Sequence, residues 1–155
     1  MYSVFDIASY FIKKAIQNRN PLTPIQIMKL CYFAHGYKLA LDEEPLVDEL
    51  VQAWKYGPVF KDLYHALKIY GNKQINKVPD IFESDDEVFN QNDLEILDAV
   101  YESLSDMDGM SISDLTHEKD SPWSKVWTER ASTVPFTPID NVYIKDYFKK
   151  VLDEQ

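Results

Sequence analysis

Ala53-Trp54-Lys55-Tyr56-Gly57-Pro58-Val59 is the stretch that we expect to decide the fold of this chain. Trp54 and Tyr56 lie two residues apart, so in an extended segment both side chains would point to one face. Gly57 permits backbone angles that other residues avoid, and Pro58 suits the first position of a helix. Apolar residues then recur at helical spacing, at Val59, Phe60, Leu63, Tyr64, Leu67 and Tyr70. The stretch therefore predicts a corner from which a helix departs, with aromatic side chains that could serve as core, as binding surface, or as both.

The composition fits one compact domain that spans residues 1–155. Hydrophobic residues make up 45% of the chain and aromatic residues 14%, which favours a packed globule over a disordered chain. Cys31 is the only cysteine, which excludes an internal disulfide and a multi-cysteine zinc site and suits a reducing compartment. The sequence shows neither a secretory signal nor a segment of membrane-spanning length. We therefore expect a cytoplasmic protein.

The negative charge is concentrated in one part of the chain. Residues 80–120 hold fourteen Asp or Glu and only Lys119 as a base, so this segment carries −13 while the remainder carries +3. Such a field repels the phosphates of nucleic acids and anionic membranes, and it attracts basic protein surfaces. A solvated helix face is the other interpretation of the same charge run. In either case we expect neither a nucleic acid nor a membrane as a partner, since the lysines form no basic stripe.

Start signals for helices recur along the chain. Ser3-Val4-Phe5-Asp6 resembles a capping box, and Thr23-Pro24-Ile25-Gln26 combines a cap, a proline at the first helical position and a glutamine three residues after the cap. The second signal predicts a long central helix. Further starts are expected at Asn92, Ser111, Ser121 and Asp140. The sum is a mainly α fold, a single compact domain of six to seven helices, in which 46–54 and 75–89 could add a small β-hairpin or short strands.

Residues with catalytic or metal-binding potential are scattered. No phosphate loop, nucleophile elbow or zinc-protease motif is present. His117 and Glu118 could act as an acid–base pair or as metal ligands together with His35, but neighbours in a helix do not face each other. Cys31 sits in an apolar helix pattern, which favours a core residue over a nucleophile. We expect no enzyme, cofactor or metal; a hydrolase or metal-dependent enzyme that uses His35, His117 and Glu118 is the alternative.

Taken together, several stretches resemble the Panacea domain, the family of SocA-like antitoxins that includes the phage-associated GepA proteins. The matching segments are Leu22-Thr23-Pro24-Ile25-Gln26-Ile27-Met28-Lys29-Leu30-Cys31-Tyr32-Phe33-Ala34-His35-Gly36, Pro45-Leu46, Ala53-Trp54-Lys55-Tyr56-Gly57-Pro58-Val59 with Tyr64, Leu115-Thr116-His117-Glu118 and Pro122-Trp123. The order and spacing of these segments make the resemblance more specific than any one of them alone.

The resemblance implies a helical antitoxin that neutralises a toxin encoded beside it, in bacteria or in their phages and plasmids. In the SocA branch the antitoxin is an adaptor that delivers its toxin to a Clp-type protease, whereas other members are thought to bind the toxin directly. We predict direct protein–protein binding, with delivery to a Clp-type protease as the alternative. The resemblance does not name the toxin or the oligomeric state.

We assign partner binding to five residues at the corner and on the helix after it: Trp54, Tyr56, Gly57, Pro58 and Tyr64. Aromatic side chains there would supply much of the affinity. The acidic segment would steer the encounter with a basic toxin, and Asp85, Asp86 and Glu87 are the acids chosen to test this. Core packing is the other interpretation of Trp54, as of Trp123 and Trp127.

Overall fold

The structure, a computed structural model, describes residues 1–82, 88–130 and 136–154. These residues form seven α-helices and a small sheet, which confirms the mainly α prediction. The helices are α1 (Val4–Gln17), α2 (Pro24–Asp42), α3 (Lys61–Leu67), α4 (Gln91–Leu104), α5 (Gly109–Thr116), α6 (Pro122–Arg130) and α7 (Asn141–Asp153). Two short 3-10 helices, η1 (Lys68–Tyr70) and η2 (Asp80–Phe82), lie between α3 and α4. None of the helices in the described ranges is long and apolar enough to cross a membrane.

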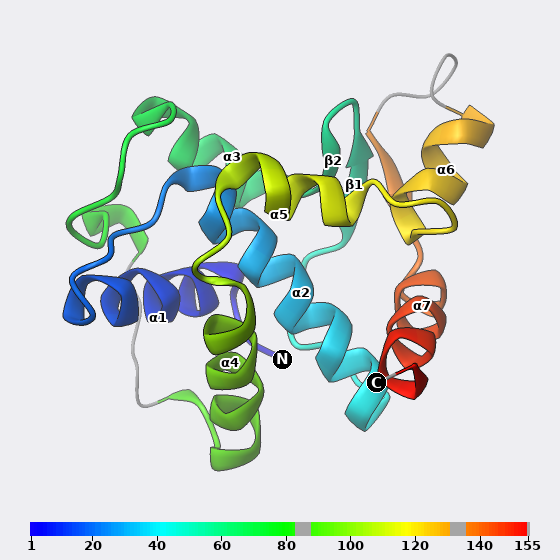
Figure 1. Cartoon of the computed structure of the whole chain (residues 1–155), viewed down its shortest axis with the longest axis horizontal. Helices are drawn as coiled ribbons and strands as arrows, with labels where there is room; N and C mark the ends of the chain where they lie inside the picture. The colour runs from blue at the N-terminus through cyan, green and yellow to red at the C-terminus, as the bar shows by residue number, and fades with distance from the viewer. Residues whose placement is uncertain (83–87, 131–135, 155) are drawn as a thin grey trace.

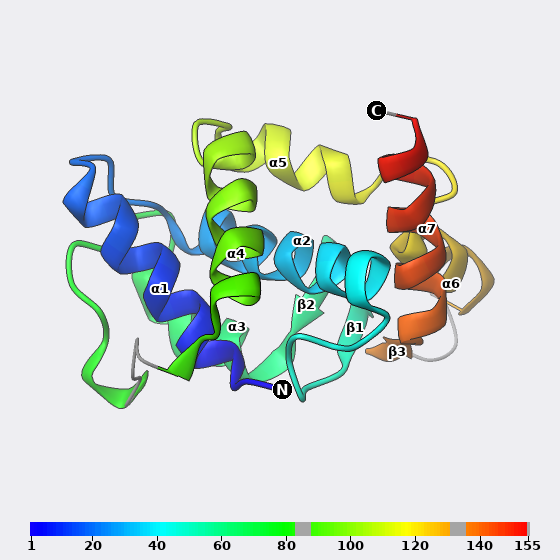
Figure 2. The ribbon, with the colours of Figure 1, turned by 90° about the horizontal axis from the view of Figure 1, so that it is seen from below.

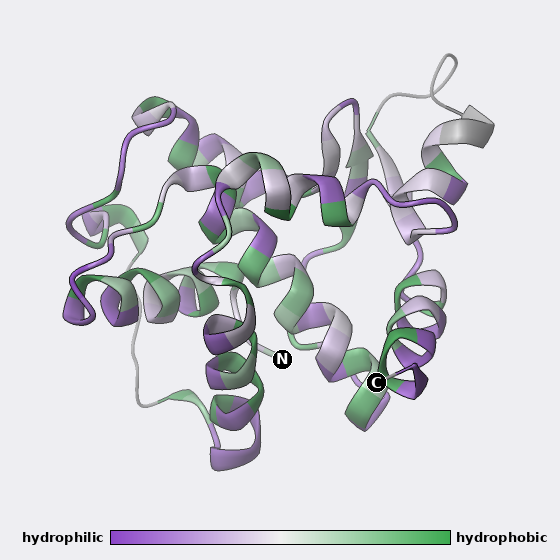
Figure 3. Cartoon of the chain, in the orientation of Figure 1, coloured by the Kyte–Doolittle hydropathy of each residue, from purple (hydrophilic) through white to green (hydrophobic). Residues whose placement is uncertain are grey.

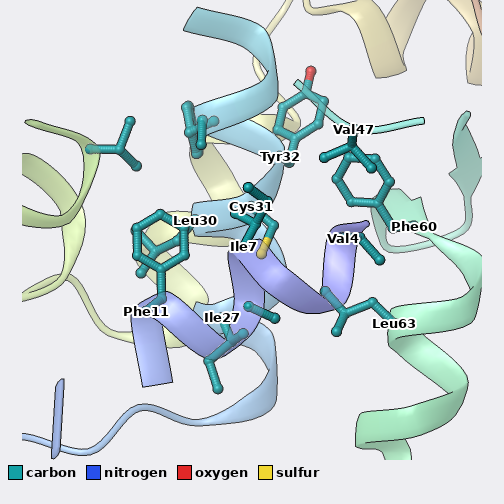
Figure 4. Packing of buried hydrophobic residues seen from close by; sticks show 14 of the residues in the cluster. Val4, Ile7, Phe11, Ile27, Leu30, Cys31, Tyr32, Val47, Phe60 and Leu63 are labelled. Carbon is teal, nitrogen blue, oxygen red and sulfur yellow. The ribbon is translucent and has the colours of Figure 1, made fainter. Parts of the chain in front are cut away.

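Helix α2 runs through the middle of the molecule, and α1, α4, α5 and α7 all pack against it (Figures 1 and 2). Its sequence explains this position, because apolar residues lie on more than one of its faces and so can be buried on several sides. In Figure 4, Ile7 and Phe11 of α1 lie against Leu30 and Cys31 of α2. The outer helices α1, α4 and α7 instead carry both hydrophobic and hydrophilic residues along their length (Figure 3). Each of them buries only its apolar side.

The predicted caps are confirmed at four helices, one of which is α6, where Ser121 Oγ accepts from the amide of Ser124 at 3.2 Å. Ser3 Oγ accepts a hydrogen bond from the amide of Phe5 at 3.1 Å, at the start of α1. At α2, Thr23 and Gln26 form the expected capping box, in which the backbone N–H of Thr23 donates to Gln26 Oε1 at 2.9 Å. At α7 the cap is Asp140, which accepts from the amide of Val142 at 2.9 Å.

Two predicted helix starts are wrong by a few residues. Helix α4 begins at Gln91 and not after Asn92, because Asn90 Oδ1 already accepts from the amide of Asp93 at 2.8 Å. In α5 the cap is Asp108, which accepts from the amide of Ser111 at 2.8 Å, so Ser111 lies inside the first turn. In both cases an earlier side chain reaches the free amide three residues on.

The corner is a β-hairpin. Strands β1 (Val51–Trp54) and β2 (Gly57–Phe60) pair antiparallel, and β3 (Thr137–Ile139) pairs with the other edge of β1 to give the order β2-β1-β3. Pro58 therefore lies in a strand, and the helix expected from Val59 begins only at Lys61. An edge strand tolerates a proline because its outward N–H is not needed for pairing. The strand expected around 46–54 is thus confirmed for its second half, whereas β3 was not predicted.

The segment 75–89 contains no strand in its described residues, which are 75–82, 88 and 89. The 3-10 helix η2 occupies its middle, next to Pro79, and packs against α1. A proline removes a donor from any strand ladder and so favours such a turn. The rest of the segment, and with it Asp85, Asp86 and Glu87, lies outside the described residues.

Two carboxylates of the acidic segment hold α4 in place. Asp93, 3% exposed, accepts hydrogen bonds from Lys38 Nζ at 2.8 Å and from Tyr2 Oη at 2.5 Å. Burial disfavours its charged form, but the hydrogen bonds from Lys38 and Tyr2 outweigh burial, so the pKa of Asp93 lies below its usual value. Asp98 pairs with Lys14 at 2.8 Å. These acids are structural, and they account for part of the charge run.

Candidate protein-binding surface

The tip of the hairpin is a two-residue turn, Lys55-Tyr56, closed by the pair Trp54 and Gly57. Gly57 has φ +125°, a conformation that residues with a Cβ rarely adopt. The turn makes the hairpin short and tight, but it also means that Tyr56 does not continue the strand of Trp54. The expectation of one shared extended face for the two aromatics is therefore wrong.

Beneath the turn lies Lys29 of α2, which is 3% exposed. Its Nζ donates a hydrogen bond to the carbonyl oxygen of Pro58 at 3.2 Å. In the part of the chain that the structure describes, no carboxylate lies within ion-pair distance of this amine. Burial lowers the pKa of Lys29 to about 8. The hairpin thus rests on a buried amine that one backbone carbonyl partly satisfies.

The end of α5 closes the same space from the side. A Cβ on Gly57 would lie 2.9 Å from both His117 Cε1 and Lys29 Nζ, and 3.2 Å from Thr116 Oγ1. His117 Nδ1 donates to the carbonyl of Ser113 at 2.7 Å, which fixes the orientation of the ring. Gly57 is therefore required twice, by its backbone angle and by this close packing.

Helix α6 joins the hairpin through Trp123. Its Nε1 donates to the carbonyl oxygen of Trp54 at 2.6 Å, and its ring packs edge-on against His117 with centroids 4.4 Å apart. Trp127 stacks on Trp123 with ring centroids 5.7 Å apart and an interplanar angle of 14°. The hairpin, α2, α5 and α6 thus all contact one another around Gly57. These contacts give the hairpin a rigid base.

On this base lies a set of aromatic side chains that we call the hairpin surface: Trp54, Tyr56, Tyr64 and Phe136. The half-buried ring of Trp54 lies 4.8 Å from Tyr64 and 4.9 Å from Phe136 between centroids. Tyr56 is 73% exposed and Phe136 is 54% exposed. Exposed aromatic rings beside a rigid aromatic cluster can bind another protein at a low entropic cost.

The five residues assigned from sequence divide into two groups. Trp54, Tyr56 and Tyr64 present aromatic surface, whereas Gly57 and Pro58 are buried and support the turn from within. Sequence reasoning missed Phe136, because its place beside Trp54 depends on the pairing of β3 with β1. It also gave no role to Lys29, although a lysine within a helix that is apolar on several faces is a signal of an unusual environment.

The histidines and Glu118 are not gathered into one site. His35 is fully buried: its Nε2 donates to Asn141 Oδ1 at 3.0 Å, and its Nδ1 accepts from the amide of Val47 at 3.3 Å. Burial lowers the pKa of His35, so the neutral ring that these bonds require is favoured. Glu118 accepts from Tyr147 at 3.3 Å. Among the described residues no three His, Cys, Asp or Glu are placed to hold a metal ion.

Comparison with known proteins assigns the family. The family described as antitoxin SocA-like, Panacea domain, matches residues 27–124, which include Lys29, the hairpin, His117 and Trp123. The chain belongs to this family. It is 31% identical to Antitoxin SocA of Caulobacter vibrioides (strain NA1000 / CB15N) over 127 residues, an alignment that covers 77% of this chain and 68% of that protein. No solved structure matches. Membership in the SocA-like family supports an antitoxin role and implies a toxin as partner in general.

Proposed function

We propose that this SocA-like chain neutralises its toxin by binding it directly, and that the hairpin surface makes the central contact. Family membership supports the antitoxin role, while the contact is inferred from the surface itself. The observation that carries it is the packing of the exposed Phe136 and of Tyr64 against Trp54, next to a turn on which Tyr56 is 73% exposed. Tyrosine and tryptophan are enriched among the residues that dominate the energy of protein interfaces.

Acidic residues near the base of the hairpin would speed the encounter. Asp114 and Glu118 lie on the last turn of α5 and just after it, and both are exposed. Helix α5 packs against β2, so these carboxylates lie at the end of the helix that supports the hairpin. They are the described acids that best fit a steering role toward a basic toxin, because the acids first chosen, at 85–87, lie outside the described residues.

Co-purification tests the proposal. The chain is co-expressed with the protein from the adjacent reading frame, and its Tyr56→Ala/Phe136→Ala variant is compared with Ile81→Ala. Ile81 is a matched control, since it is 71% exposed and lies on η2, which packs against α1. We expect wild type and Ile81→Ala to retain the partner and to restore growth. The double variant should lose about a hundredfold in affinity, because two contacts of about 1.4 kcal/mol each are truncated.

Two outcomes would count against this proposal. If the double variant, shown to be folded by circular dichroism, retains the partner as wild type does, then the hairpin surface is not the contact. If neutralisation disappears in cells that lack the Clp-type protease, then the chain acts as a proteolytic adaptor and direct binding is only its first step. Persistence of neutralisation in such cells is the expected result.

A further inference from the structure

An apolar groove lies between α4 and α7, over the C-terminal turns of α2. Its volume is about 350 Å³. Tyr37 and Leu41 of α2 form its floor, with Ile96, Val100 and Leu104 of α4 on one side and Leu152 of α7 on the other. Both views of the ribbon show α4 and α7 on opposite sides of this end of α2 (Figures 1 and 2). The groove shares no residue with the hairpin surface.

The exposed side chain of Leu41 favours the binding of another apolar surface to this groove. The side chain is 56% exposed, although it lies among apolar neighbours from three helices. A single exposed leucine is ordinary, but one that continues an apolar groove is typical of an interaction site. Burying it together with Leu152 would remove apolar area from water and so favour association.

The dimensions of the groove fit a helix. Ile96, Val100 and Leu104 recur every fourth residue along α4, so they form a row about 12 Å long at 1.5 Å per residue. An amphipathic helix presents apolar residues at positions i, i+3 or i+4, and i+7, over about the same length. The apolar stripe of such a helix would lie along α4 and contact Leu41 below it.

The two edges of the groove differ in charge. On α4, Glu95 and Glu102 are exposed and seven residues apart, so they share the helix face next to Ala99, which also lines the groove. Glu102 has no ion-pair partner among the described residues. The α7 edge carries both signs: Lys149 and Lys145 reach Glu43 at 2.9 and 3.8 Å, and Asp146 and Asp153 lie near Lys149.

From this asymmetry we infer that the groove is a second docking site, which binds an amphipathic helix of a partner protein. The apolar stripe of that helix is flanked by Lys or Arg on the side that faces α4. The accessible apolar residues Leu41, Ala99 and Leu104 contact the stripe above the nearly buried Ile96 and Val100. The exposed carboxylates of Glu95 and Glu102 accept the basic flank. The inference does not depend on the hairpin surface.

Two fluorescent, helix-stabilised peptides test it. Both carry leucines at i, i+4 and i+7, and they differ only in two flanking residues, which are Lys in one and Glu in the other. By fluorescence anisotropy we expect the Lys peptide to bind about tenfold more tightly than the Glu peptide, from attraction in one and repulsion in the other. Leu41→Asp should abolish binding, and Glu95→Lys/Glu102→Lys should reverse the preference. Ile81→Asp, an exposed apolar position outside the groove, is the control.

Several results would overturn the inference. Equal binding of both peptides would show that the groove does not recognise the basic flank. Binding that survives Leu41→Asp would show that the peptide does not bind in the groove. A wild-type dimer that becomes monomeric in Leu41→Asp would show that a second copy of this chain is the occupant. The Tyr56→Ala/Phe136→Ala variant should bind the Lys peptide as wild type does, so failure of this inference and failure of the hairpin proposal remain distinguishable.

Discussion

At the scale of single residues, burial of the Lys29 amine at the base of the hairpin lowers the stability of the folded chain. The amine is buried with one backbone acceptor and, among the described residues, no carboxylate within ion-pair distance. Burial lowers its pKa from 10.5 to about 8, which corresponds to roughly 3 kcal/mol of pH-dependent stability. Below pH 8 the full cost of burying a charge is present. Between pH 8 and 10.5 the unfolded chain holds more protons than the folded one, so stability rises with pH.

We therefore expect the free energy of unfolding of wild type, minus that of Lys29→Met, to increase by roughly 3 kcal/mol from pH 7.5 to 10.5. Taking the difference cancels other groups that titrate in this range in the unfolded chain, including Cys31 and Tyr32, whose pKa burial raises in the folded chain. Urea unfolding at several pH values gives the measurement, and Lys73→Met, at an exposed lysine, is the control. A difference that stays flat across the range would mean that Lys29 is not buried as a charged group.

Gly57 is the second residue on which the hairpin depends. Gly57→Ala should lower the free energy of unfolding by more than about 1 kcal/mol, because it combines a positive φ with contacts to Lys29 and His117. Gly71 offers a matched control: it also has a positive φ, +59°, but nothing lies within 4 Å of the position that a Cβ would occupy there. Chemical denaturation of both alanine variants isolates the contact. Equal losses in the two would leave backbone strain as the whole explanation.

At the scale of elements, α2 and α7 approach each other closely at Gly36. A Cβ on Gly36 would lie 2.3 Å from Cε2 of Phe148, a ring that is 1% exposed. In a helix, alanine is normally about 1 kcal/mol better than glycine, but here overpacking should win. Gly36→Ala is thus expected to cost about 2 kcal/mol, and Phe148→Leu in the same chain should recover part of it. Thermal or urea unfolding measures both effects, and a stabilised Gly36→Ala variant would contradict this packing.

Local and non-local features of these elements differed in how well the sequence predicted them. The caps at Ser3, Thr23 and Asp140 were predictable because a cap is a contact within four residues. The strand at Pro58 was not, because its neighbours fit a helix start equally well and only pairing with β1 decides. Phe136 was missed for the same reason, since β3 is far from β1 in the sequence.

At the scale of the whole molecule, the acidic segment serves more than one purpose. Asp93 and Asp98 hold α4, Glu95 and Glu102 border the groove, and other acids lie near the hairpin. Its total charge could be counted from the sequence, but this division could not, because it depends on which helix faces which neighbour. A charge run therefore predicts a field and not a site.

Steering of the toxin is a property of that field. Asp114→Lys/Glu118→Lys should slow association with the toxin by about tenfold at low salt and flatten its salt dependence, while dissociation changes little. Surface plasmon resonance over a range of salt concentrations measures both rates. Asp80→Lys/Glu44→Lys carries the same charge change at exposed positions elsewhere and is expected to have a smaller effect. Identical salt slopes in the two variants would show that only net charge matters.

Titration of the purified toxin's activity with purified antitoxin, in the absence of any protease, is the most direct measurement of neutralisation through the hairpin surface. Direct binding predicts that wild type and Ile81→Ala inhibit stoichiometrically, and that Tyr56→Ala/Phe136→Ala needs about a hundredfold higher concentration. Full toxin activity at a molar excess of wild type would contradict direct neutralisation. Equal inhibition by the double variant would contradict the role of the hairpin surface.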